Sequence, residues 1–138
     1  MVRVNGYEVQ EGLYYHKEHL WVRLEDGLAR VGISDYGQKA LRDVVFVELP
    51  PEGSDVAQDE PCGTIESVKA VVDIVAPLSG TVEEANEALT ERLELINQDP
   101  YGEGWLITLS PSNLEEELRN LLSLDEAVEF YKELAQEE

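Results

Sequence analysis

Lys69 lies in the stretch of this chain whose residue types are best suited to chemistry, Glu66-Ser67-Val68-Lys69-Ala70-Val71-Val72-Asp73. It falls between two apolar, strand-like segments, where the chain must turn, and its neighbours Val68 and Ala70 are uncharged. A rigid turn that presents one long, flexible side chain suits a tethered cofactor, because the protein supplies the position and the cofactor supplies the chemistry. A tether also raises the effective concentration of its cargo at successive partner sites. We therefore predict an attachment site at Lys69, against the alternative of an ordinary solvated lysine.

The other candidate groups predict neither an enzyme nor a metal centre. His16 and His19 are three residues apart, but they stand at a strand entrance and no cluster of Cys, Asp or Glu completes a metal site. Cys62, the one cysteine, lies among small residues at a strand start, where a buried thiol is the ordinary expectation. The sequence contains no G-x-S-x-G, no phosphate-binding glycine loop and no H-E-x-x-H. We expect no catalytic residue and no bound metal.

The hairpin that would hold Lys69 is predicted from the segments on either side of it. Residues 64–67 lead up to the turn and residues 71–75 lead away from it, and Pro77 and Gly80 end the second segment. Closer to the N-terminus, residues 20–24 alternate between apolar and polar types, and Asp26-Gly27 signals a tight turn. Residues 20–33 are therefore predicted to form another hairpin.

A short helix and further strands are predicted around these hairpins. Ser34 is expected to cap a helix that runs to about Arg42. The apolar side of this helix is expected to consist of Tyr36, Ala40 and Leu41. Residues 44–47 read as a strand of the buried kind, and residues 105–109 as the final strand.

The central region contains a repeat at an offset of 27 residues. Each copy has the pattern of strand, break, turn and strand, with Pro and Gly at matching positions in the two copies. Two such units are expected to form two small antiparallel sheets related by a pseudo-two-fold axis, which close a flattened barrel or sandwich over one core. The matching pairs are Val44 with Val71, Val45 with Val72, Pro50 with Pro77 and Gly53 with Gly80.

The C-terminal part of the chain changes to helical patterning. Capping boxes that begin at Ser112 and Ser123 each precede apolar residues at helical spacing. We expect a C-terminal helical pair over residues 112–136, which serves as structural padding on a β-rich core of residues 12–110. Because 138 residues suit one domain, residues 1–138 are predicted to form a single domain.

Composition limits the partners and the compartment. The chain has 30 acidic and 10 basic residues and a net charge of −20, which argues against nucleic acid and against an anionic membrane surface. The same charge favours basic partner surfaces. One cysteine excludes a disulfide framework, and the sequence shows no signal peptide and no apolar run long enough to span a membrane. We expect a monomeric cytoplasmic protein.

Residues 66–70, together with Asp73, Pro77 and Gly80, resemble the lipoyl-attachment stretch of the H proteins of the glycine cleavage system. Biotin carriers, by contrast, usually place Met on both sides of the lysine. The resemblance covers roughly residues 13–135 in order and is highly specific. Its other matching segments are His19 with Trp21-Val22, residues 32–36, residues 43–50, residues 95–97, residues 99–101 and Gly104-Trp105.

The resemblance implies a fold, a cofactor and partners. The fold would be mainly β, a barrel-sandwich hybrid of the lipoyl/biotinyl type with short helices. Lys69 would carry lipoic acid in amide linkage, with Glu66, Ser67, Val68, Ala70 and Asp73 completing the attachment site. The carrier would shuttle the aminomethyl group of glycine between a pyridoxal-phosphate glycine decarboxylase, a tetrahydrofolate-dependent aminomethyltransferase and a flavin dihydrolipoyl dehydrogenase. A lipoate-attaching enzyme would load it.

One residue departs from the family pattern. Where the family has His-Glu-Trp, this chain has His19-Leu20-Trp21, and the family glutamate helps hold the aminomethyl-loaded arm in a groove. Strand alternation would place Glu18 on the same face as Leu20, where it would compensate. Because of Leu20, the alternatives are an H-like protein used in lipoyl relay or sulfur metabolism. An unmodified β interaction module is the alternative outside the carrier class.

Overall fold

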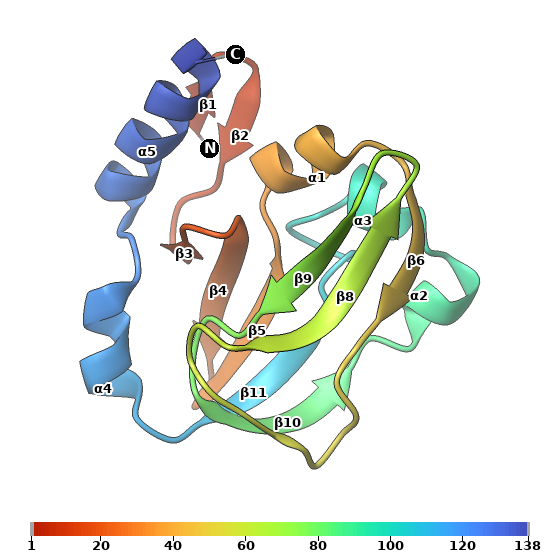
Figure 1. Ribbon diagram of the computed structural model, residues 1–138. Helices are drawn as coiled ribbons and strands as arrows, with labels where there is room; N and C mark the ends of the chain where they lie inside the picture. The colour runs from red at the N-terminus through yellow and green to blue at the C-terminus, as the bar shows by residue number, and fades with distance from the viewer. Residues whose placement is uncertain (1, 138) are drawn as a thin grey trace.

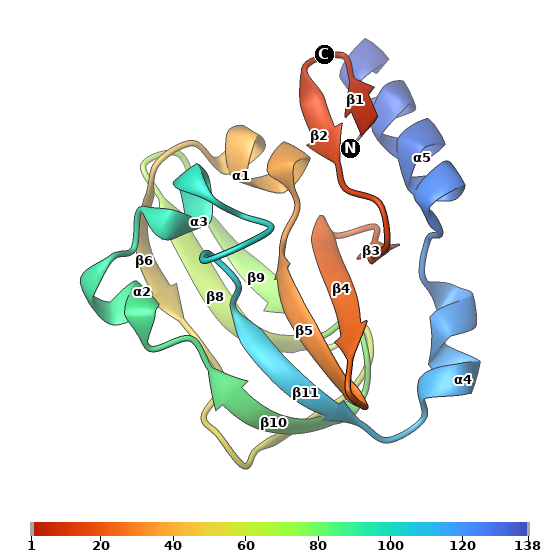
Figure 2. The ribbon, with the colours of Figure 1, turned by 180° about the vertical axis from the view of Figure 1, so that it is seen from behind.

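Two antiparallel sheets face each other in the computed structural model, which describes residues 2–137 (Figures 1 and 2). The three-stranded sheet, in front in Figure 1, has the order β6 (Val44–Glu48), β8 (Pro61–Ser67), β9 (Val71–Val75). The mainly β architecture with two antiparallel sheets is confirmed. The six-stranded sheet, in front in Figure 2, has the order β3 (Tyr14–His16), β4 (Leu20–Glu25), β5 (Leu28–Ile33), β11 (Ile107–Pro111), β10 (Gly80–Ala85), β7 (Asp55–Val56).

The two copies of the internal repeat place their strands at equivalent positions in the fold. β6 and β9 both pair with β8, one on each side of it. β7 and β10, which follow them in the two copies, pair with each other, with Gly80 opposite Val56. Each copy therefore contributes one strand to each sheet.

The main core lies between the two sheets. Ala29, Val31 and Ile33 alternate on the inner face of β5 and are buried. Ile65 of β8 and Ile74 of β9 reach the same core from the other sheet. This shared apolar core is the largest favourable term that holds the sheets together.

A second, aromatic-rich cluster covers the other side of β4. Trp21 is fully buried there, and its indole N–H donates to the carbonyl of Pro100 at 2.8 Å. It lies against Gly32 of β5, where a Cβ atom would stand 2.5 Å from the indole ring, so only glycine fits. Helix α5 (Leu124–Glu137) covers this cluster through Ala127 and Tyr131.

An N-terminal hairpin completes that cluster. β1 (Val2–Val4) and β2 (Tyr7–Val9) turn through Asn5-Gly6, both with positive φ. Val4 and Val9 are buried against α5 and α1 (Asp35–Leu41). This hairpin was not predicted from the sequence, although Asn-Gly is a strong hairpin signal. Its strands are so short that their alternation is barely visible.

The helical predictions hold in part. α1 begins as predicted, because the Ser34 hydroxyl accepts the Gly37 N–H at 3.1 Å, but Ala40 is exposed rather than packed on the core. The second capping box is present at the start of α5, where Ser123 and Glu126 each bond the other's backbone N–H. The first is absent, since α4 (Leu114–Glu117) has no side-chain cap. A 3-10 turn (Leu118–Asn120) then follows, and α2 (Ala88–Glu91) and α3 (Leu95–Gln98) are short helices between β10 and β11.

The strand predicted at residues 44–47 is present as β6, but the prediction that it is buried is wrong. A bulge between Val44 and Phe46 leaves Val45 without a partner on β8, and β6 is an edge strand. Val45 and Phe46 are about half exposed.

In the part of the chain that the structure describes, no helix is long and apolar enough to cross a bilayer.

Candidate functional site: a lysine turn beside an apolar groove

The Ser67 side chain holds the turn between β8 and β9 together. Its hydroxyl oxygen accepts the N–H groups of Lys69 and Ala70, both at 3.1 Å, and its O–H donates to the Ala70 carbonyl at 3.2 Å. The backbone N–H of Ser67 donates to the same carbonyl at 2.8 Å. These bonds use the full capacity of one hydroxyl group, so the backbone of the turn is fixed locally.

The side chain of Lys69 points away from this fixed backbone into solvent. Lys69 and its neighbours Val68 and Ala70 are exposed, and Val68 is 67% exposed. The turn is tied to the rest of the molecule by the Val68 N–H, which donates to the Asp43 carbonyl at 3.1 Å. A group attached to Lys69 Nζ would therefore swing from a rigid base.

A groove of about 300 Å³ begins beside Lys69 and runs between β9 and α1. Its floor and walls are largely apolar, and Gly37 lets α1 approach closely, since a Cβ atom there would lie 2.8 Å from atoms of His19 and Ile33. Such a groove suits an apolar chain that carries a polar end. The lining residues are Glu18, His19, Ile33, Gly37, Ala40, Leu41, Lys69, Ala70, Val72 and Asp73.

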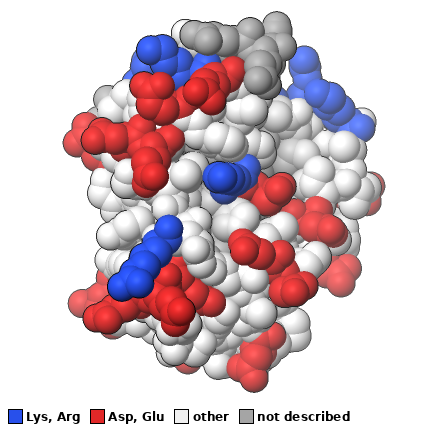
Figure 3. Space-filling model, turned by 60° about the vertical axis from the view of Figure 1, so that its left-hand side comes forward, with Lys and Arg blue, Asp and Glu red and all other residues white. Residues whose placement is uncertain are grey.

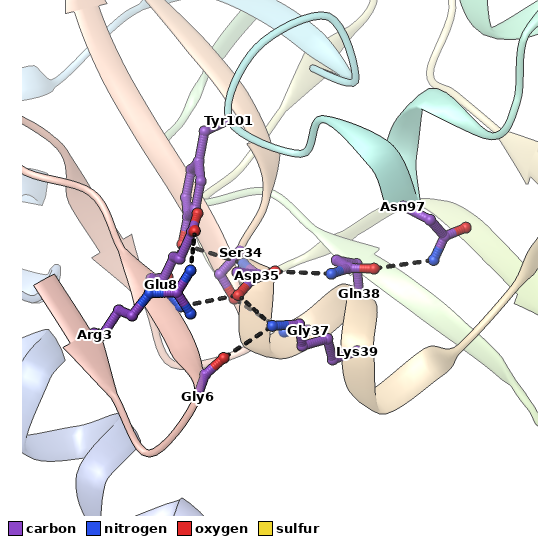
Figure 4. Close-up of polar contacts among 10 residues, drawn as sticks. All are labelled: Arg3, Gly6, Glu8, Ser34, Asp35, Gly37, Gln38, Lys39, Asn97 and Tyr101. Carbon is purple, nitrogen blue, oxygen red and sulfur yellow. Dashed lines mark hydrogen bonds and ion pairs between the residues drawn. The ribbon is translucent and has the colours of Figure 1, made fainter. Parts of the chain in front are cut away.

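Helix α1, one wall of the groove, is fixed by the buried carboxylate of Asp35 (Figure 4). One carboxylate oxygen accepts the Glu8 backbone N–H at 2.8 Å and lies 3.1 Å from Lys39 Nζ, and the other accepts the Gln38 side-chain amide at 2.8 Å. The Asp35 N–H donates to the Tyr101 hydroxyl at 3.1 Å. The carboxylate also suits the N-terminus of a helix.

Asn97 extends this network to the start of β6. Its amide N–H₂ donates to the Gln38 side chain and to the Arg42 carbonyl, and its oxygen accepts the Val44 N–H at 3.0 Å. Asp35 and Asn97 lie in segments that resemble the family, but neither was predicted as a site residue. The one local signal was an acidic residue directly after the helix cap, because the partners lie far apart in the chain.

The polar end of the groove comes from the turn between β3 and β4. Glu18 lies in this turn, and its backbone N–H donates to Nδ1 of His16 at 3.0 Å. The other ring nitrogen of His16 bonds Asp59 at 2.6 Å. Glu18 lines the groove, but the prediction that it shares a strand face with Leu20 is wrong, because β4 begins only at Leu20 and His19 has a φ of 72°.

The two histidines have separate environments. His19 packs among aromatic rings, with centroids 5.0 Å from Tyr36 and 5.8 Å from Tyr131. Burial lowers the pKa of His19, so its ring is neutral at pH 7. Among the described residues, no group of three His, Cys, Asp or Glu side chains is arranged to hold a metal ion.

Leu20 and Cys62 contribute no chemistry to the groove. Leu20 is buried in the main core opposite Ile33 and does not line the groove, so the carboxylates there are those of Glu18 and Asp73. Cys62 is half-buried in β8, and burial raises the pKa of its thiol to about 11. A thiol with this pKa is protonated and unreactive at neutral pH.

The residues predicted for the site fall into three groups. Ser67, Val68 and Ala70 form the turn itself, and Asp73 lines the groove. Glu66 lies outside the groove, exposed on β8 opposite Val71. Sequence reasoning did not find the apolar part of the lining, because Ile33, Ala40 and Leu41 become neighbours of Lys69 only through the packing of α1 beside β9.

Comparisons with known proteins point to one family. The sequence model of the family described as Glycine cleavage H-protein matches residues 13–134. The probable glycine cleavage system H protein of Pyrococcus abyssi is 50% identical over 135 residues, which are 97% of this chain and 100% of the relative. The glycine cleavage system H protein of Bacillus velezensis is 45% identical over 124 residues, or 90% of this chain and 94% of the relative.

A solved structure has the same fold. The crystal structure of a glycine cleavage system H protein from Mycobacterium marinum superimposes with a TM-score of 0.81 at 36% sequence identity. The match covers 92% of this chain and 99% of the other chain.

Proposed function

Because the chain belongs to the glycine cleavage H-protein family, we propose that it is the lipoyl carrier of a glycine cleavage system and that Lys69 bears the lipoyl group. The observation that carries the assignment to Lys69 is the exposed position of its side chain on a turn fixed by Ser67, at the entrance of an apolar groove. Members of this family are carrier subunits that bear lipoyl groups.

The residues around Lys69 fit an attached lipoyl group. Ile33, Leu41 and Val72 offer apolar surface to a hydrocarbon arm, and the carboxylates of Glu18 and Asp73 lie in the same groove. When bound, the group supplies a dithiolane that accepts the aminomethyl group of glycine as it is reduced. The carboxylates of Glu18 and Asp73 would stabilise a cationic group at the end of the arm by Coulomb attraction.

The chain itself contributes position and protection rather than catalysis. The neutral His19 and the protonated Cys62 thiol provide no activated nucleophile near Lys69. The partners in this proposal are a pyridoxal-phosphate glycine decarboxylase, a tetrahydrofolate-dependent aminomethyltransferase, a flavin dihydrolipoyl dehydrogenase and the lipoate-attaching enzyme. The single domain, monomeric state and cytoplasmic location stay predictions from the sequence.

The intact mass of the protein purified from its own cells tests the attachment. We expect an increase of one lipoyl group, mapped by peptide analysis to Lys69 and absent from Lys69→Arg. Lys132→Arg, which changes an exposed lysine of α5, is the matched control and should keep the added mass. An unmodified native protein would contradict the proposal and leave the interaction module as the better explanation.

A further inference from the structure

Exposed apolar side chains gather on one part of the molecule. Five of the large ones lie in the three-stranded sheet and its lysine turn, namely Val45, Phe46, Val68, Val71 and Val72, which are 48%, 52%, 67%, 65% and 38% exposed. Two others, Leu24 and Leu28, are each 37% exposed and lie beside the turn between β4 and β5 in the other sheet. Exposed apolar side chains concentrated in this way commonly mark an interaction site.

Strand register shows how this surface is built. Phe46, Glu66 and Val71 stand directly opposite one another on β6, β8 and β9, so they form one row across the sheet. All three are exposed, and the row therefore lies on the outer face, away from the core. We call the exposed set Val45, Phe46, Val68 and Val71 the lysine face.

The fold does not need apolar residues at these positions. Val45 is the extra residue of the bulge, and Phe46 and Val71 point away from the buried Ile65 and Ile74. Val45 and Phe46 keep about half of their surface exposed beside Leu89 and Leu93, and Val71 is 65% exposed. Each apolar side chain left in water forgoes the favourable free energy of burial, and a partner that covers it recovers that free energy.

Charged residues around the lysine face restrict the chemistry of its partner. Asp43, Glu48, Glu66 and Asp73 are exposed in or beside the sheet, whereas Arg42 is the exposed basic residue there besides Lys69. A complementary surface would have an apolar depression flanked by Lys or Arg side chains. Charge complementarity of this kind guides the orientation of the encounter.

We propose that the lysine face is the docking surface for the enzyme that attaches the acyl group to Lys69, and that this enzyme presents an apolar depression with a basic rim. The inference rests on the proposed function. It favours the attaching enzyme over the others because unmodified Lys69 reaches only a side-chain length from the turn. The enzyme that modifies it must therefore cover Val68 and Val71, whereas later enzymes meet the far end of a longer arm.

The reactants of the attachment reaction are lipoate, ATP and the side chain of Lys69. A lipoate–protein ligase first joins the lipoate carboxylate to AMP, and ATP loses pyrophosphate. The deprotonated Nζ of Lys69 then attacks the acyl carbonyl, the amide bond forms and AMP leaves. Oxidation states do not change in either step.

The first test compares rates of lipoylation by a purified lipoate–protein ligase with ATP and lipoate. The double substitution Phe46→Thr with Val71→Thr removes apolar surface while keeping strand-forming residues. We expect kcat/KM to fall about tenfold or more, mainly through KM, as for central residues of an interface. The control, Leu24→Thr with Leu28→Thr, removes two other exposed apolar residues, from the other sheet, and should change kcat/KM less than twofold.

A second measurement separates docking from chemistry. Lys69→Arg cannot be acylated, but it should inhibit lipoylation of the wild-type protein with an inhibition constant near the KM of the wild type. Adding the two threonine substitutions to Lys69→Arg should remove that inhibition. Equal inhibition with and without them, or equal kcat/KM in the first test, would overturn the docking surface while leaving Lys69 as the attachment site. Failure of the wild-type protein to be lipoylated would overturn the proposed function as well.

Discussion

The hydroxyl group of Ser67 is bonded to three backbone groups of the turn that presents Lys69. Ser67 is only 7% exposed, so water cannot easily replace these bonds. A short side chain that accepts two N–H groups and donates to one carbonyl fixes the turn without adding bulk beside the lysine. At this position the residue type therefore determines both local structure and access.

Replacing Ser67 with Ala should destabilise the protein and loosen the turn. Because the N–H groups of Lys69 and Ala70 lose their acceptor, the free energy of unfolding should fall by about 1 kcal/mol. Urea denaturation measures the change, and Ser112→Ala is the control, since Ser112 is exposed. Equal losses of stability in the two variants would contradict the role given to the Ser67 hydroxyl.

A second prediction at the residue scale concerns the carboxylate of Glu18. If its carboxylate stabilises the aminomethyl amine in the groove, Glu18→Gln should shorten the lifetime of the loaded carrier. A partly exposed charge pair contributes up to ~1 kcal/mol, so release of ammonia from the isolated loaded protein should become up to about fivefold faster. Glu83→Gln, an exposed glutamate on β10, should leave the rate unchanged. An unchanged rate in Glu18→Gln would show that the groove does not depend on this carboxylate.

Two helices determine the site at the scale of elements. α1 forms one wall of the groove and is held by the buried Asp35 (Figure 4). α5 packs over the aromatic cluster, where the Tyr131 hydroxyl lies 3.1 Å from the Ser34 hydroxyl that caps α1. The C-terminal helix was expected to be padding, yet it contacts both His19 and the cap of the groove wall.

The buried tyrosines of this cluster predict a loss of stability at alkaline pH. Burial raises the pKa of Tyr15, Tyr101 and Tyr131 above the ordinary value near 10. The folded protein therefore keeps these protons when the unfolded chain releases them, so this contribution is complete below pH 10 and is lost as pH rises further. The free energy of unfolding should decline above about pH 10.

Tyr131→Phe tests the assignment of that decline. The variant loses one group that titrates only in the unfolded chain, so its stability should fall less steeply with pH, by up to about 1.4 kcal/mol per pH unit. Urea denaturation at several pH values between 9 and 11 gives the two slopes. Parallel slopes in the variant and the wild type would show that the Tyr131 hydroxyl does not contribute.

At the scale of the whole molecule, the dominant feature is the charge of −20. Acidic side chains outnumber basic ones on the face shown in Figure 3. A strongly acidic carrier that visits several enzymes in turn is drawn to basic surfaces before any contact forms. Salt screens this attraction over about 10 Å at 0.1 M ionic strength.

Association with the glycine decarboxylase should therefore slow as salt rises. Between about 0.05 and 0.3 M sodium chloride, we expect the association rate constant to fall several-fold while the dissociation rate constant changes little. Stopped-flow measurements with the lipoylated carrier would report both constants. An association rate that is independent of salt would contradict electrostatic guidance.

The sequence by itself determined the features that depend on neighbouring residues. The hairpin around Lys69, the Ser34 cap and the capping box at Ser123 were all read correctly, because turns and caps are set by residues within a few positions of each other. Only the tertiary structure decided the composition of the groove. It joins Glu18 of one turn, Leu41 of α1 and Val72 of an edge strand, which packing alone brings together. For the same reason, the exposure of Phe46 followed from a bulge and an edge position, which hydrophobicity along the chain does not reveal.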